Sequence, residues 1–386
     1  MKPFWISGLF GLGLALAAPC VVAAQELFET KAGQAFMVDG ETGTVLFSKD
    51  PDKPIPPASL AKLMTMEVVF NALKGGRLKF DDAFYISENA WKNGGANSGG
   101  STMFAVPKSS IQLGDLIQGV IVQSANDACI AIAEGIAGSE AGFATLMTER
   151  AREIGLTTSE FRNATGLPAD GQIVTVRELV KLGRHIWQSY PEYYGYYAQP
   201  EFTWNKITQK NRNPLLRMDI GADGMKTGFT DASGYAIVGA VARQSRRLFV
   251  AMSGLASEKE RAEEARKLLD WGMRAFERRP LFQAGATVGE AQVYGGAKSG
   301  VALAANGPIA VFVPITNQDR LKARIVYDGP LEAPVAKGQP VGALKIWIGE
   351  TLSAETPLFA AEDVAVGPIY RRALDGLREL LTGWLR

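Results

Sequence analysis

The order of apolar and polar positions divides the chain into four regions. A short apolar run begins the sequence, and a long region follows in which strand-like and helix-like patterns both occur. From residue 280, short alternating runs are interrupted by Gly and Pro about every ten residues, and the last twenty residues have a helical period. We therefore expect a mixed helix-and-sheet domain, a small all-β domain and one final amphipathic helix.

The strand-like patterns lie at the two ends of the long region. Residues 36–39 and 45–47 flank a turn that contains two glycines, which predicts a β-hairpin. Residues 235–242 and 248–255 predict two further strands. The remaining apolar residues recur at the helical period, and the helices that this period predicts cover residues 59–73, 113–122, 126–136, 143–154, 176–190 and 258–276.

The expected domain limits follow these changes of pattern. We expect residues 25–279 to form one α+β domain and residues 280–366 to form a small β-rich domain. The strands expected in the second domain cover residues 301–303, 309–313, 323–327 and 343–348.

Residues 1–24 have the anatomy of a secretory signal peptide. Lys2 supplies a positive start, residues 6–18 are apolar, and the small residues at 22–24 offer a cleavage site. The alternative is an uncleaved anchor helix, but the apolar run is short for a membrane span. We therefore expect the chain to be exported and the signal to be removed.

Residues 367–386 predict an amphipathic helix. Nine apolar residues fall on one face, including Trp384, whereas the other face carries four Arg together with Asp375 and Glu379. The segment is too short and too charged to span a bilayer, and this pattern suits a membrane interface. We expect attachment to the outer face of the inner membrane, with docking of the helix on its own protein as the alternative.

Charge and cysteine content exclude several classes of function. Lys plus Arg is 41 and Asp plus Glu is 40, which gives no electrostatic reason to expect nucleic acid as a partner. Without residues 1–24, Cys129 is the only cysteine and His185 the only histidine. Such a chain can form no internal disulfide and no zinc site of the Cys/His type, and we expect neither a metal nor a cofactor.

The single histidine also argues against a Ser-His-Asp triad. His185 lies in a helical pattern beside Ile186 and Trp187, where a structural role is the ordinary one. A serine enzyme of this composition needs another base. Lysine can serve when burial or a neighbouring positive charge lowers its pKa.

Ser59 and Lys62 are candidates for the nucleophile and base of such an enzyme. They stand at positions i and i+3 of an expected helix and so share a face. Among the serines of the chain, Ser59 alone has Lys three residues further on. The alternative interpretation is a Ser that caps the helix, followed by a solvated Lys.

Two further motifs contain hydroxyl, amide and amine groups. Ser124 and Asn126 lie between two expected apolar helices, where a hydroxyl can relay a proton and an amide can bind a carbonyl. Lys226, Thr227 and Gly228 precede an expected strand. A strand edge can pair with an extended peptide, and a Lys there can hold a carboxylate.

Ser-x-x-Lys, Ser-x-Asn and Lys-Thr-Gly in this order resemble the signature of the penicillin-binding protein and β-lactamase superfamily. The segments that resemble the low-molecular-mass D-alanyl-D-alanine carboxypeptidases more closely are residues 56–65, 124–128, 161–167 and 223–230. This resemblance covers essentially the whole chain after residue 24. It implies a penicillin-binding protein/β-lactamase-like catalytic domain, then a β-domain and a membrane-attached tail.

The resemblance implies a role for each motif residue. Ser59 is the implied nucleophile, Lys62 its base, and Ser124 the group that passes a proton to the leaving amine. The residues implied to bind the substrate are Asn126, Lys226, Thr227 and Gly228. The implied substrates are peptidoglycan pentapeptide stems, the implied inhibitors are β-lactam antibiotics, and the implied location is the periplasm.

Three positions depart from the family pattern, which usually has Thr at Ala61, Gly at Ala125 and His at Phe229. Ala61 and Ala125 are small, so we expect these two differences to leave the site unchanged. Phe229 removes a polar ring near the expected carboxylate subsite, which affects the pH response and the rate more than the type of reaction.

Two other functions are open on the sequence alone. A β-lactamase commonly needs a Glu that activates water, and no clear Glu-x-x-x-Asn element lies between the second and third motifs. A catalytically silent wall-binding protein would not need three intact motifs. Rapid breakdown of a covalent penicillin adduct would indicate the first function, and absence of an adduct the second.

Overall fold

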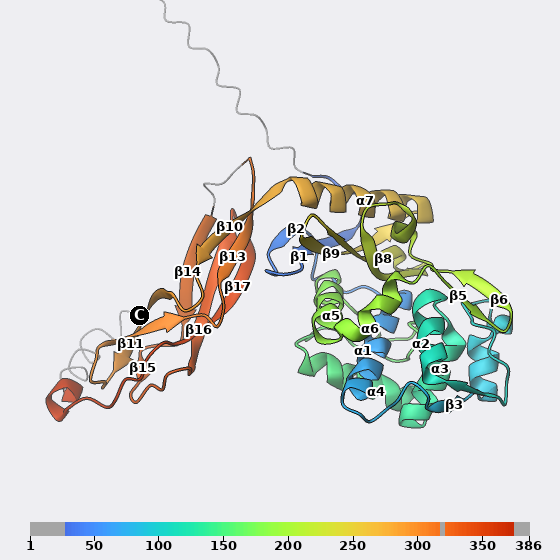
Figure 1. The fold of residues 1–386 in the computed structure, drawn as a ribbon, viewed down its shortest axis with the longest axis horizontal. Helices are drawn as coiled ribbons and strands as arrows, with labels where there is room; N and C mark the ends of the chain where they lie inside the picture. Colours follow the sequence, from blue (N-terminus) through green and yellow to red (C-terminus); the bar gives the residue numbers. More distant parts are fainter. Residues whose placement is uncertain (1–27, 317–320, 374–386) are drawn as a thin grey trace, which may run out of the picture.

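The computed structural model describes residues 28–316 and 321–373 and has two lobes (Figure 1). The large lobe, residues 28–275, combines a sheet with helices on both of its faces. The β lobe, residues 276–373, is built from strands up to residue 368. This arrangement confirms the expected α+β fold followed by a small β-rich unit. The predicted signal peptide lies outside the described residues.

The large lobe is built on a five-stranded antiparallel sheet in the order β2-β1-β9-β8-β7. The strands are β1 (Gln34–Asp39), β2 (Val45–Lys49), β7 (Ala222–Thr230), β8 (Gly234–Arg243) and β9 (Arg246–Leu255). Because β1 pairs with β9, the two ends of the lobe meet in one sheet. β7 lies at the edge, and no other described strand pairs with its outer side.

Helix α7 (Glu258–Arg274) covers one face of this sheet. Ser257 caps it by accepting a hydrogen bond from the Glu260 N–H at 3.1 Å. Its apolar side, which includes the buried Leu268, packs against sheet residues such as Val250.

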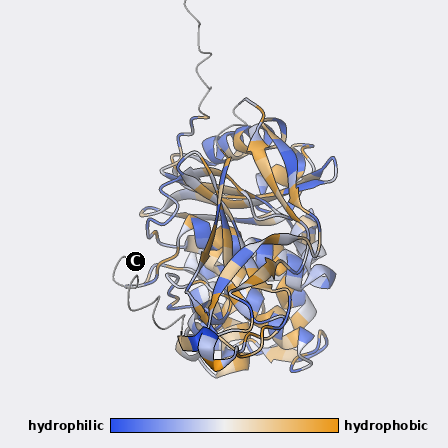
Figure 2. Ribbon diagram, turned by 90° about the vertical axis from the view of Figure 1, so that its left-hand side faces the viewer, coloured by the Kyte–Doolittle hydropathy of each residue, from blue (hydrophilic) through white to orange (hydrophobic). Residues whose placement is uncertain are grey.

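The other face carries a group of helices at whose centre α1 (Lys62–Lys74) is buried along almost its whole length. Around it lie α2 (Leu113–Val122), α3 (Asn126–Ala137), α4 (Glu140–Glu153) and α5 (Val176–Ser189). Its buried polar residues Lys62, Thr65 and Glu67 find hydrogen-bond partners inside the lobe, and its apolar residues pack on several sides, so a central position suits this helix. Hydrophobic and hydrophilic residues alternate along the outer elements, as amphipathic packing requires (Figure 2).

Several short elements complete the large lobe. They are a 3-10 turn at Ala58–Ala61, β3 (Ala83–Tyr85), a π-helical turn at Ala90–Gly94, 3-10 turns at Ala96–Ser98, Gly195–Ala198 and Pro214–Arg217, β4 (Ser110–Gln112), α6 (Pro191–Tyr194), β5 (Glu201–Trp204) and β6 (Ile207–Lys210). β3 pairs with β4, and β5 pairs with β6.

The β lobe begins as β10 (Phe276–Phe282) leaves the large lobe and pairs with β13 (Ile309–Pro314). The other strands form a sheet in the order β14-β16-β17-β12-β11-β15. They are β11 (Thr287–Tyr294), β12 (Gly300–Ala304), β14 (Leu321–Tyr327), β15 (Leu331–Glu332), β16 (Pro340–Ile348) and β17 (Thr351–Ala360). Fully buried Leu303 and Ile346 belong to an apolar cluster confined to this lobe.

The predicted helices and strands agree with the structure to within a few residues. The helix expected from residue 59 starts as a 3-10 turn, and α1 begins at Lys62. The domain limit expected at residue 280 lies inside β10, so the chain passes between the lobes within a strand.

Residues 369–373 are helical, and the continuation of the expected tail helix lies outside the described residues. Among the helices of the described part, no single one is long and apolar enough to cross a membrane. α3 and α4 reach that length and composition only together, and they are bent by 83° relative to each other.

Separate apolar clusters predict separate unfolding transitions. Leu303→Ala should lower the melting temperature of the β lobe alone, because a buried Leu→Ala change costs about 2–5 kcal/mol of folding free energy. Leu63→Ala, at an equally buried position of the large lobe, should lower only the other transition. Differential scanning calorimetry distinguishes the two. A single transition that shifts in both variants would contradict the prediction.

Candidate active site

Ser59 stands immediately before the buried helix α1, in the 3-10 turn Ala58–Ala61. Leu60 and Ala61 are fully buried and anchor this turn, whereas Ser59 is half-buried. Ala58 has a φ of +48°, a left-handed backbone that residues other than Gly rarely adopt. The turn therefore holds the Ser59 hydroxyl at the end of a firmly packed element.

Lys62 is the first residue of α1 and is 1% exposed. Its Nζ lies 2.9 Å from Ser59 Oγ and donates a hydrogen bond to the Thr165 carbonyl at 2.7 Å. Burial lowers the pKa of Lys62 to about 8. A substantial fraction of this amine is therefore neutral near pH 8 and able to accept a proton.

The loop around Thr165 keeps this carbonyl in place. Asn163 Oδ1 accepts hydrogen bonds from the Thr165 N–H at 3.2 Å, from its hydroxyl at 3.0 Å and from the Gly166 N–H at 2.8 Å. Gly166 has a φ of +79°, and a Cβ there would lie 1.7 Å from the Ala58 carbonyl oxygen. Glycine is therefore required where this loop touches the Ser59 turn.

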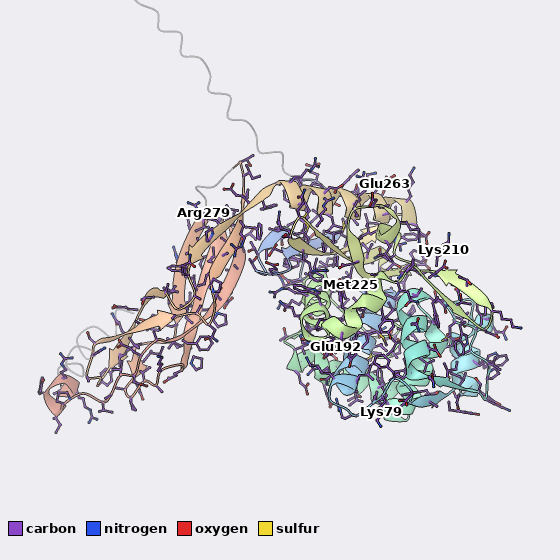
Figure 3. All side chains as sticks on the ribbon, viewed as in Figure 1. Lys79, Glu192, Lys210, Met225, Glu263 and Arg279 are labelled. Carbon is purple, nitrogen blue, oxygen red and sulfur yellow. The ribbon has the colours of Figure 1, made fainter. Side chains whose placement is uncertain are left out.

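A second hydroxyl–lysine pair lies beside the first. Ser124, in the loop between α2 and α3, has a φ of +60° and accepts a hydrogen bond from Lys226 Nζ at 2.8 Å. Lys226 lies in β7, next to Met225 at the centre of the large lobe (Figure 3), and is 2% exposed. Burial lowers its pKa well below the usual value, and the charge of Lys62 lowers it further.

The surroundings of Lys226 favour an anion. Beyond Lys62, the charges of Arg212 and Arg261 also disfavour its protonated form. Cys129 on α3 lies near both lysines, but burial raises the pKa of its thiol to about 12, so the thiol stays neutral at ordinary pH. A negatively charged ligand beside Lys226 would offset the positive charges that meet there.

Asn126 and Asp127 begin α3 and hold the neighbouring segment, residues 101–105, in place. The Asn126 N–H donates to the Ser101 carbonyl at 2.7 Å. Buried Asp127 accepts four hydrogen bonds, from the Thr102 hydroxyl and from three backbone N–H groups. Gln209 on β6 donates to the Thr102 carbonyl at 2.9 Å. This carboxylate therefore ties the start of α3 to the segment that β6 also supports.

The β7 edge closes the site on the other side. Thr227 is 7% exposed. A Cβ at Gly228 would lie 3.0 Å from Ala58 Cβ and 3.3 Å from the Ser59 nitrogen, so the strand passes directly beside the Ser59 turn. Phe229, 49% exposed, contacts Tyr235 with the ring centroids 4.3 Å apart and the ring planes tilted by 33°.

The structure thus brings the sequence-predicted residues to one place. Ser59 with Lys62 and Ser124 with Lys226 form two contacting pairs, Asn126 begins the adjacent helix, and Thr227 and Gly228 continue β7. The sequence analysis did not select Asp127, Asn163 or Thr165. Each of these residues belongs to a segment that resembles the family, so the resemblance could have pointed to them. Their contributions, however, depend on contacts with residues far away in the sequence.

The remaining candidates lie elsewhere. His185 is on α5, and its Nε2 is 3.3 Å from Glu67 Oε1. Within the described ranges, no group of three or more His, Cys, Asp or Glu side chains is arranged to hold a metal ion.

Asp127→Asn should destabilise the wall beside Asn126. An amide group replaces one carboxylate oxygen and cannot accept from two donors, which should cost about 2–4 kcal/mol of unfolding free energy. Urea denaturation measures the loss, and faster hydrogen exchange of the Met103 and Ala105 amides would locate it. Thr102→Val removes one hydrogen bond and should cost about 1 kcal/mol. Equal stability of Asp127→Asn and wild type would contradict the assignment.

Comparison with known proteins agrees with this geometry. A family model described as D-alanyl-D-alanine carboxypeptidase matches residues 20–255, and a model of the penicillin-binding protein 5 C-terminal domain matches residues 276–366. D-alanyl-D-alanine carboxypeptidase DacC of Escherichia coli strain K12 is 38% identical over 94% of this chain and 92% of its own length. DacA of Haemophilus influenzae is 36% identical over 88% of this chain and 87% of its own length.

Solved structures show the same relationship. Penicillin-binding protein 5 of Haemophilus influenzae has a TM-score of 0.75 at 35% identity, covering 88% of this chain and 99% of that one. DacD of Francisella tularensis has a TM-score of 0.70 at 30% identity, covering 88% and 95%. Sequence and structure therefore agree along both lobes, and the chain belongs to the D-alanyl-D-alanine carboxypeptidase family of low-molecular-mass penicillin-binding proteins, which makes it a serine-type carboxypeptidase.

Proposed function

We propose that Ser59 is the nucleophile of this carboxypeptidase and that Lys62 is its base. The observation that carries this proposal is the 2.9 Å contact between Ser59 Oγ and the Nζ of a fully buried lysine. Neutral Lys62 takes the hydroxyl proton while Oγ attacks the carbonyl carbon between the last two D-alanines of a peptidoglycan stem. His185, the single histidine of the chain, lies on α5 and contacts Glu67, whereas Lys62 contacts Ser59 directly.

Ser124 completes the proton path in this proposal. The tetrahedral intermediate collapses as the C–N bond breaks, and the leaving amine of the terminal D-alanine takes a proton through the Ser124 hydroxyl. The shortened stem remains as an ester on Ser59. Water then attacks that ester, Oγ recovers its proton, and the stem leaves with a new C-terminal carboxylate. Penicillin follows the first half of this route and stays on Ser59 as an acyl group.

Lys226, Thr227 and Asn126 bind the substrate in this proposal. The terminal carboxylate lies near Lys226 and the Thr227 hydroxyl, where the positive surroundings of Lys226 favour an anion. Asn126 donates to a stem carbonyl. The stem lies extended along the unpaired edge of β7, whose Gly228 leaves room for the backbone beside Ser59. Exposed Phe229 borders the carboxylate subsite with an apolar ring.

The pH dependence of acylation should report the state of Lys62. The neutral amine is the active form, so the rate of reaction with labelled penicillin should rise with pH and level off above about 8, the pKa that burial gives Lys62. Lys62→Arg keeps a positive charge but stays protonated. It should acylate at least about 100-fold more slowly and lose this rise, because a general base contributes about 10²–10⁴-fold.

Ser59→Ala is the matched control, and mass spectrometry after incubation with penicillin should find no adduct on it. An adduct that persists on Ser59→Ala would place the nucleophile elsewhere. A wild-type adduct that disappears within seconds would favour a β-lactamase, and wild-type acylation in Lys62→Arg would exclude Lys62 as the base.

We also propose export followed by attachment to the inner membrane. Residues 1–24 have the pattern of a signal peptide, and residues 367–386 have that of a basic amphipathic helix. Apolar burial and attraction to anionic lipid act together in such a helix. A basic residue near the surface contributes about 1 kcal/mol, and a well-buried Leu about 2 kcal/mol.

Truncation after Val366 should release the protein from anionic vesicles while hydrolysis of a short D-Ala-D-Ala peptide remains at the wild-type rate. Binding of the full chain should weaken with salt but not vanish, because the apolar share is not screened. Vesicle sedimentation measures both effects. If the truncated protein sediments like the full chain, the helix docks on the β lobe and does not anchor the enzyme.

A further inference from the structure

A cleft between the two lobes lies apart from the Ser59 site. Its volume is about 590 Å³, in the range of ligand-binding cavities. One wall is helix α5, and the other is the start of β17 at residues 352–355. Residues of β1, of β2 and its preceding turn, and of the segment just after α4 line the rest. The residues that α5 contributes are Arg177, Val180, Lys181, Arg184, His185 and Gln188.

The α5 wall is basic because the polar face of this amphipathic helix carries two Arg and one Lys. Its apolar residues, such as Leu179, Leu182 and Ile186, are buried in the large lobe. Positions 177, 181, 184 and 188 recur at the helical period and therefore share the opposite face. The chain thus places three of its cations in a row along the cleft.

Not all of this charge is neutralised. Arg177 forms a bidentate ion pair with Asp52 at 2.6 and 2.9 Å. Arg184 Nε and Nη2 donate to the Gly40 and Glu41 carbonyls, which have no net charge, and the Asp39 carboxylate offsets the guanidinium only at longer range, without an ion pair. Within the described residues, Lys181 makes no hydrogen bond or ion pair, and its charge acts only at longer range on the Asp52 carboxylate that already pairs with Arg177.

The opposite wall adds backbone groups without adding net charge. β17 pairs with β16 between Thr351 and Phe359, but with β12 only through Phe359 and Ala360. Before that point one edge of β17 therefore has no paired strand among the described residues, and such an edge can bind an extended peptide. Glu355 on this wall lies 3.7 Å from Lys345, which offsets its charge.

We propose that this cleft binds a second, non-reacting peptide stem of the wall polymer through its carboxylates, with Lys181 and Arg184 as the anion-binding groups. The inference rests on the proposed function, because the reaction itself leaves stems that end in a carboxylate. A stem held here keeps neighbouring stems of the same polymer near Ser59 and raises their effective concentration. A short soluble substrate gains nothing from the cleft.

Lys181→Glu tests the proposal on the full-length Ser59→Ala protein, with purified peptidoglycan sacculi as the probe. Sedimentation should show binding weakened about three- to tenfold relative to the parent, because the charge of Lys181, one of the two proposed anion-binding residues, is reversed. Lys181→Arg should bind like the parent. Lys79→Glu makes the same charge change at an exposed position outside the cleft, at the lower border of the large lobe in Figure 3, and should also bind like the parent.

Kinetics separate this proposal from the proposed function. With Ser59 intact, Lys181→Glu should hydrolyse a short soluble D-Ala-D-Ala peptide with wild-type kcat and KM. Sacculus binding equal to the parent, or an equal loss in Lys79→Glu, would overturn the cleft assignment and leave the Ser59 chemistry untouched. Failure of the Ser59-intact parent to hydrolyse the soluble peptide would overturn the proposed function instead.

Discussion

The geometry of the candidate active site requires the large lobe to hold two lysine side chains, Lys62 and Lys226, almost completely out of water. A buried ammonium group is costly unless hydrogen bonds and charges compensate for it. The Thr165 carbonyl and the Ser59 and Ser124 hydroxyls surround these amines. Each partner comes from a different part of the chain, so the site forms only when the helices and the sheet have packed together.

This requirement explains why the scaffold around the site is so well connected. α1 is buried on nearly all sides and carries Lys62 at its first residue, so the amine cannot swing out without unpacking the lobe. Asn163 holds the loop that supplies the Thr165 carbonyl, and Asp127 holds the segment beside Asn126. These contacts keep the proposed reacting groups in place before any substrate arrives, which would lower the reorganisation that the proposed reaction requires.

Much of this arrangement could be predicted from the sequence, because it depends on local spacing. The spacing of Ser59 and Lys62 predicts that their side chains meet, and they do, although Ser59 lies in a 3-10 turn and α1 begins only at Lys62. The helices from 113 to 153 have a clear apolar period that the structure reproduces. The features that the sequence pattern could not predict are those that depend on residues far away in the sequence. β10 contains Pro280 and two arginines, and only pairing with β13 makes it a strand. The Thr165 contribution is a main-chain carbonyl, whose use no side-chain pattern records.

Glycine at two positions around Ser59 limits how the enzyme can change over evolutionary time. A side chain at Gly166 would overlap the Ala58 carbonyl, and one at Gly228 would press on the same turn. Substitutions at these two positions are therefore unfavourable, even when selection favours an altered ligand preference or resistance to an inhibitor that reacts as the substrate does. The half-exposed ring of Phe229, beside the turn that joins β7 to β8, has room to vary. Adaptation should accordingly accumulate at the rim of the site and leave its centre unchanged.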